Sequence, residues 1–280
     1  MEKKIVQRKG KTSKRAFRII EDNPKGEDEK QKSYSESASP RRSHSLEEDN
    51  AYGIIFWATV AISQIIGVAL IVLLVVWGNK YGGFVATDPK LIFNYHPLFM
   101  VLGLVVCYGD AIIVYRVLRF LPKPLLKIIH AALHILAIVF SSLALVAVFE
   151  NHRRLKMDDL YSLHSWIGIL AFGAFCLQYI GGFVVFLYPG LPANWRAKIM
   201  PFHLFFGVGI FVMSVAAAGM GLTEKLLWTS GYSKLHAQGI IGNLIGLLIL
   251  VFSLLIVFLA THSTYKRKPL PNEVPNFTTN

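Results

Sequence analysis

From residue 51 onward, long apolar runs alternate with polar connections of roughly ten to twenty residues. Each run reaches the about 20 residues that a helix needs to cross the hydrocarbon core of a bilayer. Charged residues stand at the ends of the runs and not along one face, which is typical of spanning helices and not of helices lying on a membrane surface. The pattern predicts an all-α membrane protein with six transmembrane helices, at approximately 52–77, 94–115, 128–149, 162–187, 200–222 and 238–263.

The composition favours the same class of protein. Hydrophobic residues make up 54% of the 280-residue chain and charged residues 16%, against about 25% charged residues in a typical soluble domain. Residues 1–50 differ from the rest, because they hold 13 of the 29 Lys and Arg residues and 10 of the 17 Asp and Glu residues. We therefore expect a disordered cytosolic tail over 1–50, a six-helix domain over 51–265 and a cytosolic C-terminal tail over 266–280.

The formal net charge of +12 raises the question of a nucleic-acid partner. In the membrane domain, however, Lys and Arg stand in short clusters beside apolar runs, as they do in the cytosolic flanks of membrane helices. No basic face carries interleaved aromatic residues, so we expect no nucleic-acid binding. The count of Lys and Arg in the flanks places both termini in the cytosol. The alternatives for the membrane itself are a vesicle, a lysosome and the cell surface.

Four histidines stand at the starts of apolar runs, where ionisable side chains are costly and are commonly functional. His96 and His164 open the second and fourth predicted helices, and His130 and His203 open the third and fifth. Because successive helices start on alternating sides of the membrane, the first two histidines share a level near the outer face. The other two share a level near the cytosolic face, so the chain predicts two pairs.

Two imidazoles that face each other from different helices are what bis-histidine haem ligation requires, with one neutral ring nitrogen on each side of the iron. The chain has no CxxCH motif, so the pairs predict two b-type haems without covalent attachment. At about 1.5 Å per residue, the two levels lie on the order of 15–20 Å apart. Two alternatives stay open here: histidines that only hydrogen-bond to neighbouring helices, and transport of metal ions or protons, which the lone intramembrane carboxylate Asp110 disfavours.

Residues one turn from the histidines refine this prediction. His134 follows His130 by one turn and is a rival ligand or a hydrogen-bond donor to its neighbour, and we favour His130 as the ligand. Gly168 and Gly207 each follow a candidate ligand by four residues and so share its helical face. We expect these two glycines to leave room for a flat macrocycle.

Seven stretches of the chain stand in a recognisable order and spacing: FNYHPLFM (93–100), VYR (114–116), IIHAALH (128–134), AVFENH (147–152), YSLHSW (161–166), MPFH (200–203) and GLTEK (221–225). Together they resemble the cytochrome b561 family of transmembrane ascorbate-dependent oxidoreductases, over roughly 52–268. The resemblance implies that helices 2–5 enclose two b-type haems, with His96 and His164 on the outer haem and His130 and His203 on the inner one. It also implies electron transfer from cytosolic ascorbate to an acceptor on the other side, either monodehydroascorbate or a ferric chelate.

The resemblance further implies a substrate site at each face. Ascorbate is a small monoanion, so its site should combine cations with hydrogen-bond donors. The alternative for these cations is ordinary positive flanking charge. The expected residues are Lys123, Lys127 and Arg196 for ascorbate, Tyr115 as their neighbour, and Arg116 for an inner haem propionate; Asn151, His152 and Tyr161 for the acceptor, His152 also as a candidate ferric ligand; and Glu224 and Lys266 at the borders of the outer and inner haems.

Two rival functions remain at the level of sequence. One is a di-haem electron carrier that takes electrons from a protein donor instead of ascorbate. The other is a membrane transporter or scaffold without redox chemistry. Because members of the family are often homodimers, we also expect a possible homodimer contact through the charge-free first and sixth helices.

Overall fold

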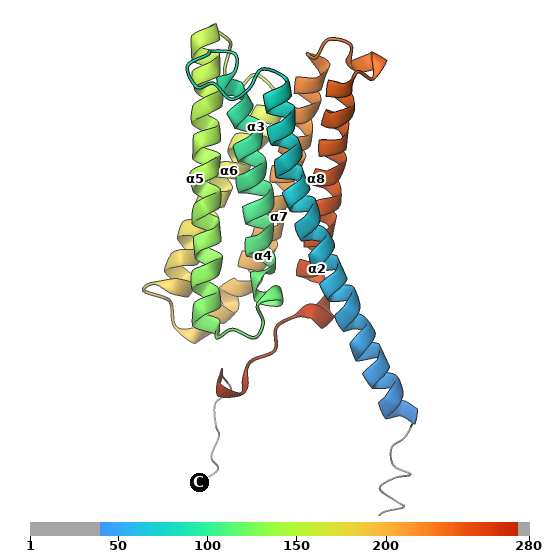
Figure 1. Cartoon of the computed structure of the whole chain (residues 1–280). Helices are drawn as coiled ribbons and strands as arrows, with labels where there is room; N and C mark the ends of the chain where they lie inside the picture. Colours follow the sequence, from blue (N-terminus) through green and yellow to red (C-terminus); the bar gives the residue numbers. More distant parts are fainter. Residues whose placement is uncertain (1–39, 274–280) are drawn as a thin grey trace, which may run out of the picture. The chain divides into compact units, whose positions relative to one another are not determined.

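The computed structural model of the chain describes residues 40–273. Six of its helices are long and apolar enough to span a membrane, and the described residues contain no strand (Figure 1). This confirms the predicted all-α membrane fold. The spanning segments are Ala51–Lys80, Ile92–Val117, Lys123–Leu155, Leu163–Leu187, Ala193–Leu227 and Ala237–Thr261.

The two predicted tails are only partly within the described chain. Helix α2 runs from Pro40 to Lys80, so residues 40–50 of the first predicted tail are its opening turns. Residues 1–39 lie outside the described residues. At the other terminus, residues 266–273 follow helix α8 (Ala237–Thr261) and end in a short 3-10 turn, Pro271–Glu273.

The helices extend beyond the apolar runs from which they were predicted. Helix α5 runs from Lys123 to Leu155 and α7 from Ala193 to Leu227. Proline in the first turn of α5 is compatible with a helix, because the first amide groups have no intrahelical acceptor. The extra turns matter for the site. His130 is the eighth residue of α5 and His203 the eleventh of α7, so neither opens its helix as the sequence predicts.

The second spanning segment changes its helical type along its length. It starts as the 3-10 turn η1 (Ile92–Asn94) and the α-helix α3 (Tyr95–Met100), widens into the π-helix η2 (Val101–Cys107) and ends as α4 (Tyr108–Val117). A second π-helix, η3 (Phe183–Leu187), follows α6 (Leu163–Gly182). Short π-helical stretches occur frequently at functional sites, and these two lie in the helices that carry His96 and His164.

Helix α8 packs closely against α4, with the ring of Phe252 against the backbone of Gly109. Phe252, Ile256 and Leu259 of α8 are buried. A Cβ atom at Gly109 of α4 would lie 2.9 Å from the Phe252 ring. A small residue is therefore required there, as is common where membrane helices meet. At its other end α8 is joined to α2, because the indole nitrogen of Trp77 donates to the carbonyl of Gln238 at 3.3 Å.

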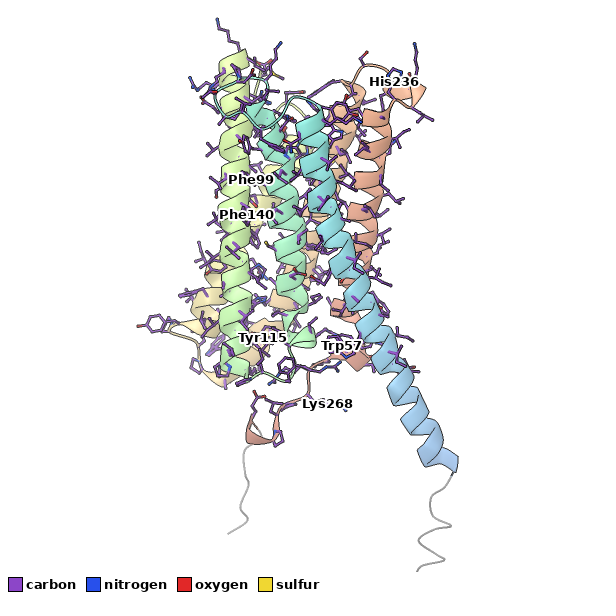
Figure 2. All side chains as sticks on the ribbon, viewed as in Figure 1. Trp57, Phe99, Tyr115, Phe140, His236 and Lys268 are labelled. Atoms are coloured by element: carbon purple, nitrogen blue, oxygen red, sulfur yellow. The ribbon has the colours of Figure 1, made fainter. Side chains whose placement is uncertain are left out.

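The helical bundle formed by residues 52–273 has two ends that carry different chemistry. We call the end that holds the segment after α8 the C-terminal end and the other the far end. Figure 2 shows Tyr115 and Lys268 at the C-terminal end and His236 at the far end. The far end contains the connections 81–91, 156–162 and 228–236, and the C-terminal end contains the connections 118–122 and 188–192 and the segment 262–273.

Candidate functional site

His96 of α3 and His164 of α6 face each other in the far half of the bundle, and we call them the outer pair. Their ring centroids are 6.1 Å apart and their planes stand at 88°. Nδ1 of His96 lies 3.1 Å from the Ala144 carbonyl oxygen, and Nδ1 of His164 lies 2.8 Å from that of Ala217. A carbonyl can only accept, so each Nδ1 carries a proton and donates it. Nε2 is then the free nitrogen of both rings.

His130 of α5 and His203 of α7 form the inner pair, nearer the C-terminal end. Their ring centroids are 6.2 Å apart and their planes stand at 65°. Nδ1 of His130 lies 2.8 Å from the Ala111 carbonyl. His203 differs from the other three, because its Nδ1 lies 3.1 Å from the side-chain amide of Gln178, which also donates to the His203 carbonyl at 2.7 Å. Because the amide nitrogen donates to this carbonyl, it also donates to Nδ1, so Nδ1 of His203 accepts, unlike Nδ1 of the other three rings.

The spacing of both pairs fits an iron ion held between the rings. With metal–nitrogen bonds of about 2 Å on each side, two opposed imidazoles have centroids roughly 6 Å apart. No group of three or more His, Cys, Asp or Glu side chains in residues 40–273 could hold a metal ion. A donor set of two opposed imidazoles fits the axial positions of a haem, whose ring nitrogens supply the other ligands.

Two glycines provide the space around these rings. A Cβ atom at Gly221 would lie 2.5 Å from Cε1 of His164, and one at Gly182 would lie 3.1 Å from Cε1 of His203. At Gly168 the nearest such atom is 4.0 Å away, and this glycine does not touch a histidine ring. The glycines that approach the rings therefore lie on helices or turns opposite each histidine, and a search of the histidine's own helical face does not find them.

His134 lies next to the inner pair but is held differently. Its ring centroid is 4.4 Å from that of His130, and it also contacts Tyr108 at 5.1 Å and Phe175 at 5.4 Å. Its Nδ1 is buried and has no hydrogen-bond partner among the described residues. No bond therefore fixes the ring of His134 for a metal, whereas His130 is anchored and faces His203.

Cations predicted for ascorbate gather at the C-terminal end. The Lys127 ammonium donates to the Phe186 carbonyl at 2.7 Å. Lys123 lies one turn before Lys127 on α5, and Arg196 lies in the first turn of α7 at the same end of the bundle. The ring of Tyr115 lies 5.6 Å from that of His130, so the cations and the inner pair share one region.

Arg116 forms a hydrogen bond with the end of helix α8. Its guanidinium donates to the His262 carbonyl at 2.5 Å, which accepts at the end of α8. This bond leaves other guanidinium donors of Arg116 available for a haem propionate.

The segment after α8 contributes two residues that the sequence reasoning missed. Arg267 forms two bonds with the Glu273 carboxylate, at 2.7 and 2.8 Å. The bond with Glu273 raises the pKa of Arg267, and the same bond lowers the pKa of Glu273 to about 2. Lys266, the residue predicted here, is exposed. An Arg and a Glu six residues apart in an irregular segment have no periodic signal that could have identified them.

A cavity of about 470 Å³ lies at the far end beside the outer pair. His152 stands at this cavity, with its Nδ1 2.9 Å from a carboxylate oxygen of Asp159. The ammonium of Lys225 lies 4.6 Å above the ring of Phe93. All four residues predicted for this side line the cavity together with the outer pair: Asn151, His152, Tyr161 and Glu224.

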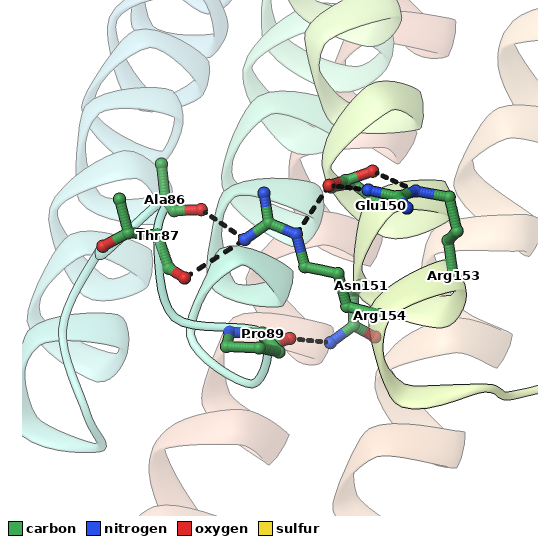
Figure 3. Close-up of polar contacts among 7 residues, drawn as sticks. All are labelled: Ala86, Thr87, Pro89, Glu150, Asn151, Arg153 and Arg154. Carbon is green, nitrogen blue, oxygen red and sulfur yellow. Dashed lines mark hydrogen bonds and ion pairs between the residues drawn. The ribbon is translucent and has the colours of Figure 1, made fainter.

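The end of α5 holds the loop that leads to His96 (Figure 3). The buried Asn151 donates its amide to the Pro89 carbonyl at 2.6 Å. Arg154 donates to the carbonyls of Ala86 at 3.2 Å and Thr87 at 3.1 Å. The side-chain amide of Asn151 therefore fixes the loop 86–89 against the end of α5, beside the cavity.

Comparisons with known proteins agree with these features. Residues 95–229 match the family model described as eukaryotic cytochrome b561. The chain is 44% identical over 216 residues to the transmembrane ascorbate-dependent reductase CYB561 of Ovis aries, which covers 76% of this chain and 85% of that protein. For the human protein of the same name the identity is 42% over 210 residues, 74% of this chain and 84% of the relative. For the lysosomal membrane ascorbate-dependent ferrireductase CYB561A3 of Bos taurus it is 38% over 220 residues, 76% of this chain and 83% of the relative.

Proposed function

The chain belongs to the eukaryotic cytochrome b561 family, and on this premise we propose that it is a reductase that moves electrons from cytosolic ascorbate across the membrane. The observation that carries the proposal is that four histidines form an outer pair and an inner pair. Each pair comes from two different helices, and both have the spacing that an iron ion needs. The names of the relatives support ascorbate as the donor.

The outer pair and the inner pair would each hold one haem b, and the two haems would supply one-electron carriers on the two sides of the bundle. The protein's part is to hold the rings. Hydrogen bonds at Nδ1 set the orientation of His96, His130 and His164 before any ligand binds. Such bonds to the second ring nitrogen also raise the basicity of the ligating nitrogen.

The C-terminal end is the donor site in this proposal and faces the cytosol, as the flanking charges predict. Lys123, Lys127 and Arg196 bind the ascorbate monoanion by charge-assisted hydrogen bonds. Lys127 is already oriented by its bond to Phe186. Each ascorbate gives up one electron and one proton and leaves as monodehydroascorbate, and the proton passes to the solvent at this end.

We infer that the outer haem lies within the cavity at the far end, because both histidines of the outer pair line it, and that the acceptor binds at the polar rim of the same cavity. The cavity is also lined by His152, Tyr161 and Lys225, so it offers both cationic and hydrogen-bonding groups. The acceptor is monodehydroascorbate or a ferric chelate, and each takes one electron. A ferric chelate would bind as a substrate, and the rim of the cavity would then have to accommodate the chelator as well as the iron ion.

An absorption spectrum of the purified full-length protein tests the proposal. We expect two haems per chain, and we expect ascorbate to reduce them. Reduction by dithionite but not by ascorbate would support the assignment of the haems and favour a protein as the electron donor. A well-folded protein without haem would overturn the proposal and return the histidines to helix–helix hydrogen bonding.

A further inference from the structure

Arg267 carries a largely enclosed charged side chain at the C-terminal end of the bundle. Its side chain is 9% exposed and that of its partner Glu273 is 17% exposed. The two terminal nitrogens of the guanidinium bind Glu273 at 2.7 and 2.8 Å, and one of them also donates to the Leu121 carbonyl at 3.0 Å. The third nitrogen, Nε, is buried and has no acceptor among the described residues. A buried charged donor without an acceptor is costly, so an acceptor is expected there.

The surroundings of Arg267 indicate what that acceptor is. Arg267 donates to the carbonyl of Leu121, in the connection that follows α4, and Tyr115 of α4 lies beside His130 of the inner pair. Glu273 also accepts the backbone N–H of Lys123 at 2.9 Å. The Arg267–Glu273 pair therefore joins the segment after α8 to the connection 118–122 and to the start of α5, the helix that carries Lys127 and His130. An anionic group in this region is the natural partner for a guanidinium N–H.

We propose that Arg267 is an anion-binding residue of the inner site and that Glu273 is the positioning residue that holds it there. The proposal rests on the proposed function. The anion is an oxygen of carboxylate or enolate type, and two sources share this chemistry: ascorbate itself, or a propionate of the haem at the inner pair. Since Glu273 cancels most of the charge of Arg267, the contact acts mainly as a directed hydrogen bond.

The test uses the purified full-length holoprotein and the variants Arg267→Gln, Arg267→Lys and Glu273→Gln. Lys268→Gln is the matched control, because Lys268 is exposed in the same segment and carries the same charge. Two quantities are measured: the KM and kcat for ascorbate, and the midpoint potentials of both haems in an equilibrium redox titration. Because Glu273 neutralises most of the charge of Arg267, loss of this hydrogen bond to the anion should resemble loss of a neutral one, with about a threefold to tenfold effect on binding.

If ascorbate is the anion, Arg267→Gln raises KM while kcat at saturation stays near the wild-type value. If a propionate is the anion, the potential of the inner haem falls, because the propionate loses its hydrogen bond and Arg267→Gln leaves the carboxylate of Glu273 unpaired, and that of the outer haem stays constant. Glu273→Gln should change KM less, because its amide oxygen still accepts from Arg267, and should raise the inner-haem potential, because the charge of Arg267 is no longer neutralised. Either result supports the proposal and identifies the source.

The proposal is overturned if neither quantity differs from that of Lys268→Gln. If Arg267→Gln does not retain haem, Arg267→Lys decides, because it keeps the charge but lacks Nε–H: an unchanged KM and unchanged potentials then overturn the proposal. A wild-type protein that holds haem but is not reduced by ascorbate would refute the donor assignment alone. The redox titration with dithionite would still decide the role of Arg267.

Discussion

His130 and Ala144 stand fourteen residues apart on α5, and each marks the level of a different histidine pair. His130 belongs to the inner pair, and the Ala144 carbonyl accepts the hydrogen bond of His96 in the outer pair. On α7 the same interval separates His203 from Ala217, whose carbonyl accepts from His164. Fourteen residues of α-helix correspond to about 21 Å. Helices α5 and α7 thus each carry one ligand candidate and one anchor for the other pair.

Replacing one histidine of a pair should remove one haem and leave the other. We expect His164→Ala and His203→Ala each to lower the haem content from two to one per chain, because each removes one of the two protein bonds to an iron whose haem has no covalent attachment. His236→Ala is the control, since His236 is exposed in a far-end connection (Figure 2). Two haems retained in both variants would contradict the ligand assignment.

His134→Asn should keep both haems. The ring of His134 has no hydrogen bond that anchors it, whereas that of His130 is held by the Ala111 carbonyl. His130→Asn, measured side by side, should lose the inner haem. The opposite result, with loss of haem only in His134→Asn, would make His134 the ligand.

Gly221→Ala should disturb the outer pair specifically. The added methyl group would lie 2.5 Å from a ring carbon of His164, so the ring has to move. We expect loss of the outer haem or an altered electron paramagnetic resonance signal from it. Gly219→Ala on the same helix meets no atom within 4 Å and should leave both haem signals unchanged; equal effects of the two substitutions would count against the packing argument.

Lys127→Ala and Arg196→Ala should weaken ascorbate binding. Each removes a charge-assisted hydrogen bond, worth about 1.5–3 kcal/mol, so KM for ascorbate should rise about tenfold or more. Lys198→Ala is the charge-matched control, because Lys198 lies 5.3 Å over the Trp195 ring and is exposed. A protein donor in place of ascorbate predicts no difference among the three variants.

The segment from Ser263 to Glu273 should keep its protection over the physiological pH range. The pKa of Glu273 falls from 4.5 to about 2 because Arg267 donates to its carboxylate. A depressed carboxyl pKa stabilises the folded state above about 4.5, and this stabilisation is lost as the pH falls toward about 2. Hydrogen exchange of residues 263–273 should therefore show constant protection from about pH 5.5 to 8 and faster exchange in Glu273→Gln. A loss of protection between pH 8 and 5.5 would refute this role of the carboxylate.

The class of fold and the number of spanning helices could be predicted from the amino-acid sequence alone. A bilayer requires about 20 apolar residues for each span, and this requirement is local, so it can be read from each run separately. The two histidine pairs also followed from local information, because helices in a serpentine chain start on alternating sides. The family followed from motifs such as YSLHSW and GLTEK, and the comparisons confirm it.

The residues that surround the histidine pairs could not be predicted from the sequence and are known from the packing of the helices. Gly221 and Gly182 approach rings on other helices, Gln178 anchors His203, and Arg267 rather than Lys266 turns inward. The bond between Glu273 and Lys123 joins residues 150 positions apart. No period along the chain encodes such contacts, because they arise from how whole helices and the segment after α8 pack together.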